Sequence, residues 1–198
     1  MRVGKIAGNF TKVAIASEMF NSNEIEKILF LEKIMKFESG TVGSGMGSAT
    51  ENLEVRSCDV SMFIPDENTG WIFERIGNFI PQLNYDHFML NINHLAPMQY
   101  TVYKDKNNGQ YDWHTDVFTA YHIFERKITG VLFLSDPESY EGGELEVMNT
   151  GSPDRAVSFK QNAGDVVFFS SHFPHRVKPV TKGTRRTIVF WVEGEREF

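Results

Sequence analysis

The sequence has little cysteine, no excess of basic residues and no long hydrophobic run, and each shortage excludes a class of protein. Its one cysteine, Cys58, leaves no partner for a disulfide within the chain, which favours a reducing compartment. The formal net charge of −6 disfavours a protein that binds nucleic-acid phosphates. No stretch approaches the roughly 18 apolar residues of a membrane span, and residues 1–20 lack the apolar core of a secretory signal. We therefore expect a soluble, cytoplasmic protein with no role at membranes or on nucleic acid.

Two local features each allow a structural and a functional interpretation. Cys58 lies in the apolar-alternating segment RSCDVSMFI (56–64), where a cysteine is usually a small buried hydrophobe, so we do not expect a catalytic thiol. The glycine-rich segment 39–50 resembles a phosphate-binding loop, but it lacks the Gly-Lys-Ser/Thr ending and no apolar helix follows it. We expect residues 39–50 to form a mobile loop.

The chain has, in contrast, many short β-prone runs and a high aromatic content of 13%. Apolar residues at helical spacing predict helices at residues 21–36 and 67–83. Beyond residue 88, short apolar runs alternate with turns rich in Gly, Pro, Asn and Asp, which is typical of a sandwich or barrel. We therefore predict a mainly β protein with supporting α-helices and a double-stranded β-helix (jelly-roll) core. The predicted strands cover residues 88–94, 99–104, 128–135, 144–148, 155–160, 165–171, 175–180 and 186–193.

The length of 198 residues suits one domain with its own core and is too short for two large domains. We predict a single domain over residues 1–198. Within it, residues 1–87 supply helical support and outer strands, and residues 88–198 form the jelly-roll core that carries the candidate site.

The segment YDWHTD (111–116) places an imidazole and a carboxylate two residues apart. Residues i and i+2 of a strand point to the same face, so His114 and Asp116 can share one cavity. A second histidine would complete the two-histidine, one-carboxylate set that binds non-haem Fe(II). Two candidates lie late in the chain, His172 and His175.

Arg185 follows His175 by ten residues, and a planar guanidinium is the expected partner of a carboxylate. A histidine followed by an arginine on the next antiparallel strand can supply a metal ligand and an anchor for an organic acid bound to that metal. We expect residues 181–183 (TKG) to form the turn of this hairpin.

Four stretches together resemble the 2-oxoglutarate/Fe(II) oxygenases of the prolyl 4-hydroxylase superfamily, particularly the PKHD-type hydroxylases of bacteria and phage. A lone His-x-Asp arises often by chance, but these stretches follow the family's order over about residues 98–193, half of the chain. They read VYKDKNNGQYDWHTD, LFLSDPESYEGGELEV, AGDVVFFSSHFPHRVKPVTKG and TRRTIVFWV.

The resemblance implies a role for each matching residue. His114, Asp116 and His175 would bind Fe(II), and Arg185 would hold the distal carboxylate of the cosubstrate 2-oxoglutarate. Two further residues would line the cosubstrate pocket: Tyr103, by a hydrogen bond, and Thr129. O₂ would be the second cosubstrate, and ascorbate would serve as reductant. The implied reaction hydroxylates a C–H bond and releases succinate and CO₂, within a site that segments 39–50 and 105–110 could close as a lid.

The sequence indicates the type of reaction more specifically than it indicates the substrate. The resemblance favours a peptidyl prolyl residue, hence a peptide or protein partner, and leaves a free amino acid or other small molecule as the alternative. Nucleic-acid demethylases of the same chemistry usually carry a second arginine six residues after the first, where this chain has Trp191. A jelly-roll module that binds a metal or ligand without catalysis is the rival from another class. The oligomeric state is not readable from the sequence.

Several neighbouring residues are expected to have plainer roles. His172 should be a near-site or surface histidine, and Arg186 should point away from Arg185 towards solvent or substrate. Wall or core positions are expected for Trp113 and Trp191, and the two acidic residues Glu141 and Glu144 would bind metal only without the triad. The remaining histidines should be structural: His87, His94 and His122.

Overall fold

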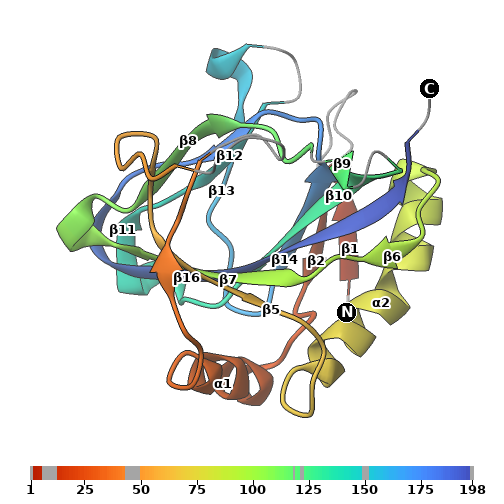
Figure 1. Ribbon diagram of the computed structural model, residues 1–198, viewed down its shortest axis with the longest axis horizontal. Coiled ribbons are helices and arrows are strands. Elements are labelled where there is room, and N and C mark those ends of the chain that lie inside the picture. Colours follow the sequence, from red (N-terminus) through yellow and green to blue (C-terminus); the bar gives the residue numbers. More distant parts are fainter. Residues whose placement is uncertain are drawn as a thin grey trace.

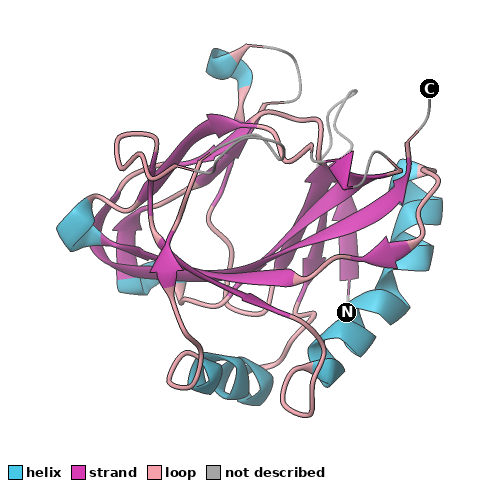
Figure 2. Cartoon of the chain, viewed as in Figure 1, coloured by secondary structure: helices cyan, strands magenta, loops and turns pink. Residues whose placement is uncertain are grey.

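The protein consists of two antiparallel β-sheets, with two α-helices against the outer face of the larger sheet (Figures 1 and 2). The structure, a computed structural model, describes residues 2–5, 13–42, 50–117, 119–120, 123–148 and 152–196. The predicted class, mainly β with supporting α-helices, is confirmed.

The larger sheet has the strand order β1-β2-β14-β10-β16-β7-β5-β3, and the smaller sheet has the order β13-β12-β15-β8-β4. Three short strands lie off this order and pair with central strands: β6 and β11 pair with β16, and β9 pairs with β10. In chain order the elements are β1 (Arg2–Lys5), β2 (Val13–Ser17), α1 (Ser22–Leu31), β3 (Glu38–Ser39), β4 (Arg56–Ser57), β5 (Asp59–Phe63), α2 (Gly70–Leu83), the π-helix η1 (Asn84–Phe88), β6 (His94–Leu95), β7 (Met98–Lys104), the 3₁₀-helix η2 (Asp105–Asn107), β8 (Gln110–His114), β9 (Thr119–Ala120), β10 (Phe124–Phe133), the 3₁₀-helix η3 (Pro137–Ser139), β11 (Tyr140–Gly142), β12 (Leu145–Val147), the 3₁₀-helix η4 (Pro153–Arg155), β13 (Val157–Phe159), β14 (Val166–Ser170), β15 (His175–Val177) and β16 (Val180–Glu195).

The larger sheet is buried on both faces, which explains its uninterrupted apolar runs. In β10, Ile128 and Leu132 belong to the core beneath the helices, whereas Val131 and Phe133 belong to the core between the two sheets. A strand that is covered on both sides reads as a continuous hydrophobic run and does not alternate. The face of β10 and β16 that points towards the smaller sheet is the one that carries the candidate site.

Both helices occur where the sequence predicts them. Helix α1 begins with a capping box, in which Asn21 and Glu24 each accept a hydrogen bond from the other's backbone N–H. It ends at Leu31, five residues before the predicted end. Glu32, which follows, accepts a hydrogen bond of 2.6 Å from Arg186 Nε. Arg186 points away from Arg185, as predicted, and its side chain, which is 31% exposed, anchors the end of α1 to the sheet.

Two local predictions are wrong. Residues 88–94 do not form a strand: the chain leaves α2 through η1, Met89 adopts a left-handed conformation (φ 54°), and only His94 begins a short strand. The 181–183 segment is no hairpin turn either, since it lies inside β16. Gly183 (φ 78°) bends β16 there, so its first residues pair with β11 and the rest enter the larger sheet, while His175 belongs to the smaller sheet.

The first half of the chain contributes strands to both sheets. Cys58 is buried between β4 and β5 and is free, as predicted. Of the glycine-rich segment, residues 43–49 lie outside the described residues. Neither α1 nor α2, nor another helix in the described part of the chain, is both long and apolar enough to cross a membrane.

Gly130 and Phe190 are directly opposite each other on β10 and β16, and the phenyl ring covers the glycine. A Cβ atom at position 130 would lie 2.2 Å from Cζ of Phe190, which is impossible without displacement of a ring that is fully buried. We expect Gly130→Ala to lower the free energy of unfolding by about 1–3 kcal/mol, the usual cost of overpacking. Chemical denaturation tests this, and Gly70→Ala, at a glycine with open space around it, is the control. Equal stability of the two variants would contradict it.

Candidate metal centre

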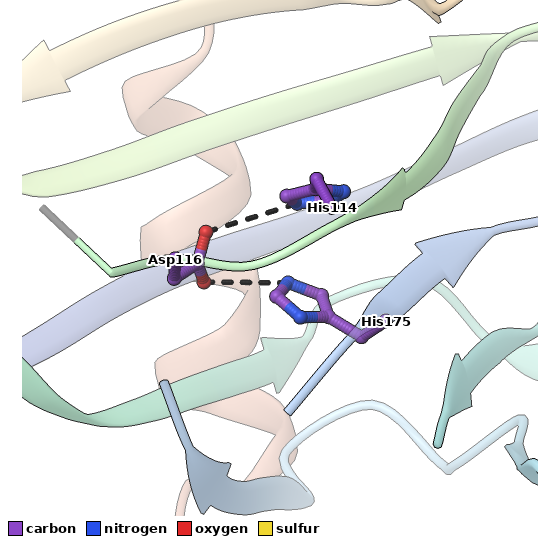
Figure 3. A group of neighbouring side chains, drawn as sticks. All are labelled: His114, Asp116 and His175. Atoms are coloured by element: carbon purple, nitrogen blue, oxygen red, sulfur yellow. Dashed lines mark ion pairs between the residues drawn. The ribbon is translucent and has the colours of Figure 1, made fainter. Parts of the chain in front are cut away.

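Three predicted ligands from two strands and an adjoining segment meet in one place. His114 ends β8, Asp116 follows two residues later, and His175 begins β15, where it is paired directly with His114. Figure 3 shows the three side chains pointing towards one another. Asp116 Oδ1 lies 3.7 Å from His114 Nε2, and Oδ2 lies 3.3 Å from His175 Nε2. Among the described residues this is the only group of three metal-ligating side chains within 4.8 Å of one another.

Each imidazole is oriented by a backbone carbonyl. His114 Nδ1 lies 2.7 Å from the Asp112 carbonyl oxygen, and His175 Nδ1 lies 2.9 Å from that of Phe173. A carbonyl oxygen can only accept, so each Nδ1 carries the proton and each Nε2 presents its lone pair to the shared centre. This is the usual outer arrangement around metal-binding histidines.

The electrostatics of the site favour the metal-binding forms of His114 and Asp116. Burial and the adjacent His175 lower the pKa of His114 to about 3, so its imidazole is neutral at physiological pH. Burial alone would raise the pKa of Asp116, but His175, His114 and the Trp191 indole together hold that pKa well below its usual range. Burial likewise opposes the charged form of His175, yet the Asp116 carboxylate raises its pKa on balance. A neutral imidazole beside an ionised carboxylate is a ready ligand pair for a divalent cation.

Aromatic rings fix the two imidazoles. The Tyr111 ring stacks on His114 with centroids 3.5 Å apart, and the Arg56 guanidinium covers Tyr111 at 4.5 Å. On the other side, the Phe169 ring meets His175 edge-on at 4.7 Å. The centre therefore has rigid walls on both sides.

Asp116 is held by two donors from the larger sheet. Trp191 Nε1 and Thr129 Oγ1 each donate to Asp116 Oδ2 at 2.9 Å. Trp191 is thus a buried wall residue, as predicted, but its contact with the carboxylate was not foreseen. Thr129, predicted to line the cosubstrate pocket, directs its hydroxyl to Asp116; its role towards the cosubstrate stays a prediction.

Arg185 is a fully buried cation without a matching anion in the described part of the chain. It is 1% exposed, and its Nε and Nη2 have no hydrogen-bond partner among the described residues. Its guanidinium lies 5.2 Å from the ring centroids of Tyr103 and of Phe133. The nearby Thr187 hydroxyl, two residues along the same strand, is also buried and unpaired there. Because an unpaired buried charge is costly, this arrangement fits an anionic ligand.

Aromatic residues connect the triad to Arg185. Tyr103 packs in one cluster with Val177 and Tyr111, and Tyr111 contacts His114. Burial raises the pKa of Tyr103, as does the neighbouring Cys58, so its phenol keeps its proton and can donate. Tyr140 lies close enough to Arg185 for the guanidinium to oppose the rise in its pKa caused by burial. The interior between the two sheets thus offers metal ligands at one end and a cation with phenols at the other.

The other candidates do not join the triad. The His172 side chain is 56% exposed and lies 4.0 Å from Glu125. The predicted alternative ligands Glu141 and Glu144 form ion pairs with lysines, Lys182 and Lys178 respectively. His122 lies outside the described residues. Segment 105–110 begins with the 3₁₀-helix η2 (Asp105–Asn107) and runs into β8, and a 2.7 Å hydrogen bond from Gly183 N to Asp105 ties it to β16. Its movement as a lid stays a prediction.

The sequence did not predict two contacts with the metal ligands, that of Tyr111 with His114 and that of Trp191 with Asp116. Both depend on tertiary structure, although strand alternation gave one signal. Trp191 lies six residues after Arg185 on β16, so the two side chains share the inward face.

Comparison with known sequences identifies the region that carries the site. Residues 98–193 match the model of the 2OG-Fe(II) oxygenase superfamily. The chain is 39% identical over 101 residues to a PKHD-type hydroxylase of Crocosphaera subtropica, which is 50% of this chain and 43% of that relative. It is also 39% identical over 92 residues to the PKHD-type hydroxylase YbiX of Escherichia coli, covering 44% of this chain and 40% of YbiX. The chain thus spans less than half the length of these relatives.

Solved structures share the fold over nearly the whole chain. A prolyl-4-hydroxylase of Pseudomonas putida superposes with a TM-score of 0.67 at 16% identity, covering 94% of both chains. A prolyl hydroxylase of Trichoplax adhaerens, solved with a peptide fragment of hypoxia inducible factor, gives 0.73 at 17% identity, covering 92% of this chain and 83% of that one. At such identities the likeness establishes the jelly-roll fold.

Proposed function

The chain belongs, through residues 98–193, to the 2OG-Fe(II) oxygenase superfamily, and on that premise we propose that it is a 2-oxoglutarate-dependent dioxygenase that hydroxylates a C–H bond. The family uses Fe(II), 2-oxoglutarate and O₂. The observation that carries the proposal is the convergence of His114, Asp116 and His175 on one point between two sheets that also enclose Arg185, whose Nε and Nη2 have no hydrogen-bond partner among the described residues.

In this proposal the three ligands hold the iron through two Nε2 atoms and the Asp116 carboxylate. Bound iron and its cosubstrates supply the oxidising equivalents for C–H hydroxylation, with release of succinate and CO₂. The two-histidine, one-carboxylate set suits this task because it leaves coordination positions open. The carbonyls that accept from the Nδ1 atoms fix the tautomer of both imidazoles and keep both Nε2 atoms aimed at the centre.

Arg185 binds the distal carboxylate of 2-oxoglutarate through the two nitrogens that lack a partner. A guanidinium can donate to both oxygens of a carboxylate at once, and burial strengthens this interaction because water does not compete. Tyr103 donates its phenolic proton to the same ligand. The rings of Tyr103, Phe133 and Tyr111 exclude water from the space between Arg185 and the triad.

The substrate is a peptidyl prolyl residue in a peptide or protein. Support comes from the relatives: the two superposed structures are prolyl hydroxylases, one of them with a bound peptide. The net charge of −6 supports a partner other than nucleic acid.

The proposed activity is tested without knowledge of the substrate. Purified protein is incubated with Fe(II), 2-oxoglutarate, O₂ and ascorbate, and succinate is measured. Slow uncoupled turnover is expected to produce succinate that depends on Fe(II), 2-oxoglutarate and O₂. Proline-containing peptides are then screened for the gain of one oxygen atom and for faster succinate formation.

If no succinate is formed, anaerobic binding of Fe(II) and 2-oxoglutarate is measured to decide whether the protein has the proposed site. If both bind, the assignment as a 2-oxoglutarate-dependent dioxygenase stands and a wider range of substrates is searched. Lack of binding contradicts the proposal and favours a jelly-roll module without this chemistry. A free amino acid or other small molecule that stimulates turnover, when no peptide does, overturns the prolyl assignment alone.

A further inference from the structure

One oxygen of Asp116 receives two hydrogen bonds, and the other receives none among the described residues. Both the Trp191 indole and the Thr129 hydroxyl donate to Oδ2 at 2.9 Å. A carboxylate oxygen has two lone pairs in the carboxylate plane, so two well-placed donors use the hydrogen-bonding capacity of Oδ2. Oδ2 also lies 3.3 Å from His175 Nε2, but the two donors already use its lone pairs. Oδ1, which faces His114 Nε2 at 3.7 Å, accepts no hydrogen bond among the described residues and keeps its lone pairs for another partner.

The two donors are set by the register of the larger sheet. Thr129 on β10 and Trp191 on β16 are a directly opposed pair, so their side chains leave the sheet on the same face and close together. They are 0% and 4% exposed. Neither side chain can turn away to solvent, and the pair acts as one rigid clamp on the carboxylate.

Each donor is itself supported. Thr129 Oγ1 lies 2.9 Å from the Ser171 hydroxyl. Because the single threonine proton goes to Asp116, Ser171 must be the donor in that contact, which orders the chain Ser171 to Thr129 to Asp116. Behind the indole, the Arg126 guanidinium lies 3.6 Å from the Trp191 ring centroid. A cation over the ring draws electron density from it and makes the indole N–H a stronger donor.

We propose that Trp191 and Thr129 are positioning residues that occupy Asp116 Oδ2 and thereby make the carboxylate a one-oxygen metal ligand through Oδ1. This inference rests on the proposed metal centre and deepens it. A carboxylate can bind a metal through one or both oxygens, and a second bond would consume a coordination position that the reaction needs for its cosubstrates. The clamp therefore preserves the open positions and fixes the direction of the ligand.

The test uses metal binding rather than turnover. Cobalt(II) is titrated into the apoprotein, since its visible spectrum reports coordination, and difference infrared spectra report whether the aspartate binds through one oxygen or two. Wild type is compared with Thr129→Val, Trp191→Phe and the double variant. Matched controls are Thr101→Val, at a fully buried threonine of β7, and Trp71→Phe, whose indole donates to the Asn68 carbonyl.

We expect each single substitution to weaken cobalt binding by about 10–100-fold, the usual effect of losing an outer partner of a metal ligand. The double variant should show the infrared signature of two-oxygen coordination and bind 2-oxoglutarate more weakly once loaded with metal. The controls should bind cobalt as wild type does. Thermal melts identify any variant that fails to fold, and the nearly isosteric Thr129→Val keeps the test valid if Trp191→Phe is unstable.

The outcomes separate this inference from the proposed function. Wild type that binds no cobalt or Fe(II) overturns the metal centre itself. The clamp alone is overturned if wild type binds cobalt tightly, Thr129→Val and Trp191→Phe bind it equally tightly, and the double variant retains one-oxygen coordination. Equal loss in the variants and in the matched controls also overturns it, because the effect would then reflect packing.

Discussion

Replacing Asp116 by alanine is expected to abolish Fe(II) binding and succinate formation together. The carboxylate is the only anionic group in the triad, and its low pKa keeps it charged at physiological pH. Loss of one of three ligands should weaken metal binding by well over the roughly 100-fold that loss of an outer partner can cause. Anaerobic Fe(II) titration and the succinate assay measure the two effects independently.

The control for this prediction is Asp112→Ala. Asp112 is an exposed aspartate on β8, the strand that ends at His114, and the part of it that orients His114 is its backbone carbonyl, which alanine retains. This variant should bind iron and form succinate as wild type does. Iron-dependent succinate formation at the wild-type rate by Asp116→Ala would show that the triad is not the metal site.

Replacing Arg185 by methionine is expected to weaken 2-oxoglutarate binding strongly while leaving the apoprotein folded. Two charge-assisted hydrogen bonds would be lost, each contributing about 1.5–3 kcal/mol, so the affinity should fall by at least about 100-fold. No buried anion among the described residues loses its partner, so removal of the cation need not destabilise the apoprotein. Calorimetric titration with 2-oxoglutarate and chemical denaturation measure the two quantities.

Arg186→Met, at the adjacent arginine, should give the opposite result. Arg186 pairs with Glu32 at the end of α1, so its loss should lower stability and leave 2-oxoglutarate binding intact. A ligand at about 100 times its Kd raises the free energy of unfolding by about 2.7 kcal/mol, and only Arg185→Met should lose this stabilisation. Wild-type affinity for 2-oxoglutarate in Arg185→Met would exclude Arg185 as the anchor.

The fold class and the candidate metal ligands could be predicted from the sequence because both depend on local patterns. The apolar runs of β10 and β16 mark strands covered on two faces, and His-x-Asp marks two ligands on one side of the chain. A third ligand and Arg185 could be assigned only by resemblance, since local patterns do not say which distant strands meet.

The errors arose where tertiary structure overrides local pattern. Residues 88–94 have strand-like composition, but the π-helix η1 and the left-handed Met89 turn the chain before a strand can begin. Gly183 was expected in a hairpin turn; its positive φ instead bends one long strand between two partners. The contact between Trp191 and Asp116 joins residues 75 positions apart, and no local sequence pattern indicates it.

The candidate site combines residues from both sheets. The metal ligands lie on the smaller sheet and the segment after β8, whereas Arg185, Thr129 and Trp191 extend from the larger sheet. The two sheets must therefore be correctly packed for the site to exist, and the core between them, with Phe133 and Phe169, serves both stability and chemistry.

The most direct test of the account is anaerobic addition of 2-oxoglutarate to the Fe(II)-loaded protein, followed by visible absorption. Chelation of Fe(II) by a 2-oxo acid gives a charge-transfer band that neither component gives alone. We expect this band in wild type, its loss in Asp116→Ala, and in Arg185→Met its appearance only at much higher 2-oxoglutarate concentration. A wild-type protein that binds Fe(II) and 2-oxoglutarate without the band, or binds neither, would show that the triad and Arg185 do not form one catalytic site.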